Sequence, residues 1–97
     1  MEWIQERPGK HIFINDKYVG IVLYEEVNQY KFYIDIQTDN SQRLTFPICV
    51  KKEGNSLERV KELAYKTLVV NIKKRLLDYK KVVLEYEKLL LELGEEA

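Results

Sequence analysis

The residues of this chain that could take part in chemistry are few and lie far apart. His11 is the only histidine and Cys49 the only cysteine. A protein metal site needs several ligands at fixed spacing, and a nucleophilic cysteine needs a base that the fold places beside it. One histidine and one distant cysteine supply neither set. We therefore expect His11 to be a structural strand residue and Cys49 to be a packed or edge thiol.

Carboxylate pairs are the next candidates, because acid–base catalysis commonly uses two acids that face one substrate. The available groupings are Glu25 with Glu26 and Asp35 with Asp39. Neighbours in a regular strand point to opposite faces, so Glu25 and Glu26 cannot work as a pair. The glycines stand singly, which excludes a glycine-rich phosphate loop. The sequence predicts no catalytic, metal or cofactor residue, no small-molecule substrate, and therefore no enzyme.

Composition narrows the class of protein further. Sixteen basic residues balance sixteen acidic ones, which argues against the broad positive field of a protein that coats DNA. A single cysteine excludes an intramolecular disulfide and favours a reducing, cytoplasmic setting. The first residues carry acids and no apolar segment, unlike a signal peptide. No apolar run approaches the roughly 18 residues of a membrane span, so we expect a soluble protein that does not bind membranes.

The first half of the chain has the composition and alternation of β-strands. Four segments rich in β-branched and aromatic residues are separated by short polar turns: 10–15, 18–25, 30–38 and 43–50. Connections this short favour hairpins and therefore an antiparallel meander. Pro47 lacks an N–H and suits an edge strand. Gly20 indicates a bulge or a close approach of two backbones.

The two faces of the predicted sheet differ. One face carries the apolar residues that we expect to contact the helix: Ile34, Ile36, Phe46 and Ile48. Tyr18, Tyr24 and Tyr33 fall on the other face, for which the chain has no obvious cover. Tyrosine buries a large area at a small entropic cost. These three side chains are the predicted surface for a protein partner.

The second half of the chain has the pattern of one long amphipathic helix. No Gly or Pro occurs from Leu57 to Leu93, and residues 51–55 form the only evident linker. Asn55 or Ser56 suits the N-cap, Gly94 suits the C-terminal end, and residues 94–97 are expected to be a frayed tail. The predicted fold is α+β, a four-stranded antiparallel meander followed by one long C-terminal amphipathic helix over 56–93. Residues 1–97 form a single domain.

An apolar stripe runs along the whole predicted helix, with Tyr65, Ile72, Tyr79, Tyr86 and Leu93 recurring every seven residues. The helix would be on the order of 55 Å long, more than a small sheet can cover. The simplest way to bury the remainder is self-association as a homodimer. The residues predicted to self-associate are Tyr79, Val82, Val83, Tyr86, Leu89, Leu90 and Leu93.

A shorter helix is the structural alternative. Asn71 and Asp78 are poor helix formers within the stripe. A turn near 75–78 would give two helices, one on each face of the sheet, and a monomer would then suffice. The unbroken seven-residue rhythm and the lack of Gly or Pro favour the single helix.

Charge is distributed unevenly along the helix. Residues 66–81 include six basic residues and one acid, Asp78. The residues from 82 onward include five acids and one base, Lys88. An antiparallel pair would place each acidic end beside the basic middle of the other copy. The competing interpretations are a parallel pair and charges that only solvate an outer face.

Two functions follow from these features. The first is a small non-catalytic interaction or regulatory module that dimerises through its helix and binds another protein, a profile also typical of accessory factors of phages and mobile elements. The alternative is nucleic-acid binding, in which the basic part of the helix contacts phosphates. Its candidate residues are Lys73, Lys74, Arg75, Lys80 and Lys81.

Overall fold

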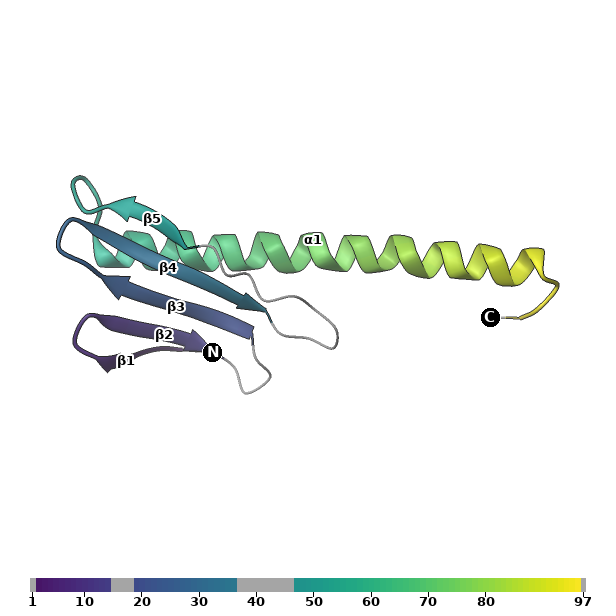
Figure 1. Ribbon diagram of the computed structural model, residues 1–97, viewed down its shortest axis with the longest axis horizontal. Helices are drawn as coiled ribbons and strands as arrows, with labels where there is room; N and C mark the ends of the chain where they lie inside the picture. Colours follow the sequence, from purple (N-terminus) through teal and green to yellow (C-terminus); the bar gives the residue numbers. More distant parts are fainter. Residues whose placement is uncertain (1, 15–18, 37–46, 97) are drawn as a thin grey trace.

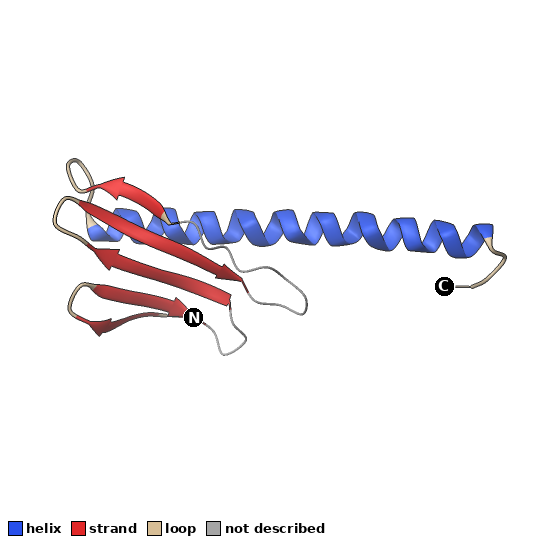
Figure 2. Ribbon diagram, in the orientation of Figure 1, coloured by secondary structure: helices blue, strands red, loops and turns tan. Residues whose placement is uncertain are grey.

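The computed structural model describes residues 2–14, 19–36 and 47–96. It contains a five-stranded antiparallel sheet and one long helix, α1 (Leu57–Glu92), as Figures 1 and 2 show. The strands follow the order of the chain across the sheet: β1 (Trp3–Arg7), β2 (Lys10–Ile14), β3 (Val19–Glu25), β4 (Gln29–Ile36) and β5 (Ile48–Lys51). The predicted α+β meander with a C-terminal helix is confirmed.

The strand that the sequence analysis missed is β1. It pairs with β2 through Trp3 opposite Phe13 and Ile4 opposite Ile12, so the sheet has five strands instead of four. Pro8 and Gly9 form the turn between these strands, and Gly9 has a positive φ of 78°. A Pro-Gly dipeptide is a strong turn signal and could have revealed the hairpin.

The core lies between one face of the sheet and the first turns of α1. Ile21, Leu23 and Phe32 are fully buried in adjacent strands, and Val60 and Ala64 of the helix cover them. Ile34 and Ile36 are buried on this face as predicted, whereas Ile48 at the edge is partly exposed. Phe46 lies outside the described residues.

Gly20 is confirmed as a site of close backbone approach. A Cβ atom there would lie 2.6 Å from Cγ1 of Ile14 and would also meet the carbonyl oxygen of Phe13. A side chain at this position would force the paired strands β2 and β3 to shift. Pro47 lies directly before β5, which is an edge strand, as predicted.

The helix is continuous from Leu57 to Glu92, so it does not break near 75–78. Ser56 is the N-cap, with its Oγ accepting a hydrogen bond of 3.2 Å from the backbone N–H of Arg59. Gly94 takes a positive φ of 76° immediately after the last turn. Both capping residues match the sequence expectation.

The helix extends far past the sheet (Figure 1). The residues of α1 that are buried are Val60, Ala64 and Leu68, all in its first third. The radius of gyration is 18.1 Å, against about 13 Å for a compact domain of this size. The molecule measures 61 × 26 × 19 Å, and its long axis follows α1. In the described ranges no helix is apolar enough over a sufficient length to span a membrane.

Candidate functional site

The distal apolar surface of α1 is the most extensive candidate site. We call Tyr79, Val82, Val83, Tyr86, Leu89, Leu90 and Leu93 the overhang stripe. Val82 follows Leu68 by two heptads, so it lies on nearly the same side of the helix as the residue that packs on the sheet. Leu90 is half-buried, and the exposure of the other six residues runs from 43% at Val82 to 74% at Leu93. The surface that forms the core thus continues beyond the sheet as an exposed apolar strip.

An apolar hollow marks the point where the helix leaves the sheet. Its volume is about 220 Å³, and Val19, Ile36, Ile72, Arg75, Leu76 and Tyr79 line it. Tyr79 belongs both to the hollow and to the overhang stripe. The stripe therefore leads directly into a concave apolar surface at the end of the sheet.

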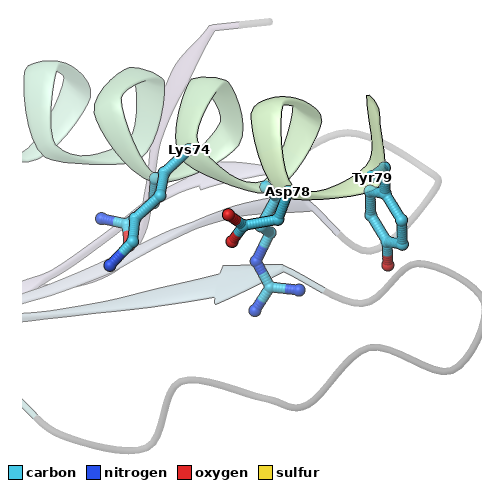
Figure 3. Close-up of a pocket in the computed structure, with 5 residues that line it drawn as sticks. Lys74, Asp78 and Tyr79 are labelled. Atoms are coloured by element: carbon cyan, nitrogen blue, oxygen red, sulfur yellow. The ribbon is translucent and has the colours of Figure 1, made fainter. Parts of the chain in front are cut away.

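A second hollow, about 410 Å³ in volume, lies beside the first on α1. Figure 3 shows Lys74, Asp78 and Tyr79 projecting from the helix around it. Asn71 and Arg75 also line it, so the lining residues within the described ranges all come from α1. The described lining residues form a depression of mixed polarity on the helix surface, and among them there is no convergent set of catalytic groups.

Arg75 is less exposed than the four lysines that were predicted with it to contact nucleic acid. Lys73, Lys74, Lys80 and Lys81 are exposed. Arg75 is half-buried and lines the apolar hollow beside the sheet. The lysines remain available to an anionic partner, whereas Arg75 lies beside Tyr79 in the hollow at the end of the overhang stripe.

Tyr24 and Tyr33 lie together on the face of the sheet away from α1. They occupy adjacent strands, with ring centroids 6.2 Å apart and an interplanar angle of 89°. Both side chains are half-buried. Tyr18 lies outside the described residues. The structure therefore brings together two of the three tyrosines that were predicted to form a partner surface.

Two lysines that the sequence analysis did not select flank these rings. The Nζ atoms of Lys10 and Lys31 each lie 5.8 Å from the centroid of Tyr24. Strand register explains the arrangement, since Lys10 and Lys31 are the direct partners of Tyr24 on either side. The carboxylate of Glu26, 3.6 Å from Lys31 Nζ, raises the pKa of Lys31, and Tyr33 adds to this effect. We call Tyr24, Tyr33, Lys10 and Lys31 the tyrosine face.

The tyrosine face and the helix lysines do not form one site. The tyrosine face lies on one side of the sheet and α1 on the other. A single strand of nucleic acid cannot stack on Tyr24 and contact Lys80 without passing around the sheet. The structure therefore gives two separate surfaces.

His11 and Cys49 lie on opposite faces of the sheet. His11 is 5% exposed on the side facing the helix, whereas Cys49 is exposed and pairs in register with Lys31 on the other side. Their side chains cannot act on one substrate atom. Within the described ranges, no three His, Cys, Asp or Glu residues are grouped closely enough to hold a metal ion.

Comparison of the chain with protein-family models, curated proteins and solved structures gave no match.

Proposed function

We propose that this protein is a non-catalytic interaction module that forms an antiparallel homodimer through the overhang stripe. The observation that carries the proposal is the continuity between the core-forming side of α1 and the exposed stripe beyond the sheet. A monomer leaves this apolar strip in water. A second copy would remove it from water, which is favourable in proportion to the apolar area buried.

Charge supports the antiparallel orientation. In a pair centred near Leu84, the acidic end of one helix, with Glu92, Glu95 and Glu96, lies beside the basic segment around Arg75 of the other. A parallel pair places the two acidic ends side by side, and like charges repel. The antiparallel pair also brings Leu93 of each copy to the apolar hollow of the other.

The test is the molar mass in solution, measured by light scattering after gel filtration at low and high salt. We expect the wild type at twice the chain mass of 11.6 kDa. Tyr86→Glu with Leu90→Glu places charges in the stripe and should give the mass of one chain. Leu84→Glu with Leu91→Glu is the matched control, because it adds the same charge to neighbouring exposed positions outside the stripe.

Two results would contradict the dimer. One is a wild type that keeps the mass of a single chain at every concentration. The other is an equal loss of mass in both double variants, which would point to charge and not to the stripe. Circular dichroism of each variant shows whether the helix is still folded, so that unfolding is not mistaken for dissociation.

The tyrosine face is the surface we propose for a protein partner of the dimer. Aromatic rings flanked by cations combine apolar area with orientation-dependent contacts, and tyrosine and cationic side chains often contribute strongly to protein interfaces. Half-buried tyrosines held by their neighbours lose little entropy on binding. A cytoplasmic location is part of the proposal and rests on the single cysteine.

Nucleic-acid binding is the alternative function, favoured by the four exposed lysines on α1. Replacing Lys73, Lys74 and Lys81 with Glu should then abolish retention on a duplex DNA or RNA column at low salt. A wild type that is not retained at low salt excludes this alternative.

A further inference from the structure

A second apolar row runs along α1 on the side away from the sheet. Its members recur every seven residues, and we call them the outer ridge: Leu63, Val70, Leu77, Leu84 and Leu91. Their exposed fractions run from 44% at Leu63 to 76% at Leu91. At 3.6 residues per turn, Leu77 lies roughly half a turn around the helix from Leu68 and Tyr79. The outer ridge is therefore separate from the overhang stripe.

Lysines border the outer ridge on both sides. Val70 is followed three and four residues later by Lys73 and Lys74, and Leu77 in the same way by Lys80 and Lys81. Lys66 begins one row and Lys88 continues the other, and the rows end at Glu87 and Glu95. Residues three and four positions apart are neighbours on a helix surface. All six lysines are exposed.

The flanking charge argues against a second copy on this ridge. If two outer ridges met along their whole length, in parallel or antiparallel about Leu77, the lysine rows of one copy would face those of the other, and like charges would oppose the contact. The central ridge residues also argue against bare phosphates as the ligand, because Leu77 and Leu84 would stay exposed between the two rows. A ligand that complements the outer ridge therefore has apolar residues along the middle of its binding surface and acidic residues on both sides.

The seven-residue period of the outer ridge favours a helix over a flat membrane as its ligand. A row with this spacing drifts about 20° per heptad on a straight helix, or roughly 80° over the four heptads from Leu63 to Leu91. A flat bilayer would meet only part of such a row. A partner helix that winds around α1 in a left-handed supercoil follows the row along its whole length.

We infer that the outer ridge binds an acidic amphipathic helix of a different protein. The apolar seam of that helix packs on the central ridge residues Val70, Leu77 and Leu84, and its acidic flanks face the two lysine rows. Dimerisation through the overhang stripe leaves the ridge open, because the two surfaces lie on opposite sides of α1. Both can be occupied at once, so this inference does not depend on the proposed homodimer.

The experiment uses a synthetic five-heptad peptide with leucine and isoleucine along one seam and glutamate on both flanks. Repulsion between the glutamates opposes pairing of the peptide with itself. Fluorescence anisotropy of the labelled peptide should show binding to the full chain, and binding should weaken as salt rises. An otherwise identical peptide with lysine flanks should bind at least ten-fold more weakly.

Variants locate the binding surface. Leu77→Gln with Leu84→Gln should weaken binding at least ten-fold, and so should Lys73, Lys74, Lys80 and Lys81 changed together to Gln. Glutamine is a good helix former and these positions are exposed, so α1 should persist, as circular dichroism can verify. Tyr86→Glu with Leu90→Glu should leave peptide binding within about two-fold, a difference of about 0.4 kcal/mol.

Several outcomes overturn the inference. Unchanged binding after the Leu77 and Leu84 substitutions would show that the peptide does not bind at the outer ridge. Equal binding of the peptide with lysine flanks would show that charge does not select the ligand. Absence of peptide binding, with ridge-dependent retention of phosphatidylserine vesicles or of duplex DNA instead, would replace the acidic helix with that ligand.

Discussion

The Nε2 atom of His11 lies 3.6 Å from Oε2 of Glu25, across the β2–β3 hairpin and beneath the helix. Nε2 is buried and has no hydrogen-bond partner in the described part of the chain. A buried polar atom that lacks a hydrogen bond lowers stability by about 1–3 kcal/mol. His11 is therefore a position at which a substitution can raise the stability of the fold.

Replacing His11 with leucine, which has a similar volume, should raise the free energy of unfolding by about 1 kcal/mol. Urea denaturation followed by circular dichroism measures this change. Glu25→Gln is the control for the charge beside it and should change stability little. A loss of stability in both variants would show that the His11–Glu25 contact stabilises the fold.

The orientation of the proposed dimer can be tested by exchanging two charges. In the antiparallel pair Arg75 of one copy lies near Glu92 of the other, so Arg75→Glu should weaken the dimer about ten-fold, or 1.4 kcal/mol. Adding Glu92→Arg in the same chain should restore it, as sedimentation equilibrium can measure. In a parallel pair each residue meets its own counterpart, so each substitution replaces one repulsive like-charge contact by another, and the single and double variants should both dimerise about as well as the wild type.

Changing Tyr24 and Tyr33 to serine should cost less than about 2 kcal/mol in total, because both rings are half-buried on the face away from the core. Phe32→Ala, a buried position on the opposite face, should cost about 3–5 kcal/mol. Thermal unfolding of the three proteins compares them. If the tyrosine variant loses as much stability as Phe32→Ala, the two rings belong to the packed structure and not to an exposed binding surface.

Gly20→Ala should destabilise the sheet by about 1–3 kcal/mol, since the new Cβ would collide with Ile14 and with the backbone at Phe13. Gly94→Ala meets open space at the exposed helix end, so its loss of about 1 kcal/mol should come only from the strain of alanine at a φ of 76°. Denaturant titration of both variants tests the difference. Equal stability losses would mean that β2 and β3 separate readily at Gly20.

The sequence was most informative where one periodic signal extends over many residues. The heptad rhythm through Ile72, Tyr79 and Tyr86 predicted a continuous helix, and local chemistry at Ser56 and Gly94 predicted its ends. Strand β1 was missed because Trp3–Arg7 alternates weakly and its burial comes mainly from Trp3, which packs against Phe13.

The parts of the candidate sites that depend on contacts between strands could not be predicted from the sequence. Tyr24 and Tyr33 could be placed on one face from alternation, but the lysines around Tyr24 depend on the register of three strands. The outer ridge was overlooked because it has only one apolar residue in each heptad, and lysines surround it. The apolar stripe on the other side of the helix has two or three apolar residues in each heptad and gives a stronger signal. Its exposure in the structure made that weaker row visible.

The end of the sheet also limits how far a helix paired with the overhang stripe can extend along α1. The sheet covers the same side of α1 at Val60, Ala64 and Leu68 that the overhang stripe occupies farther on. A helix paired with the stripe must stop where the sheet begins, close to the hollow at Val19 and Ile36. In the proposed dimer, the sheet would therefore limit the length of the helix pair. Removing seven residues from the overhang should shorten the pair by two turns while keeping its apolar side in phase with the sheet.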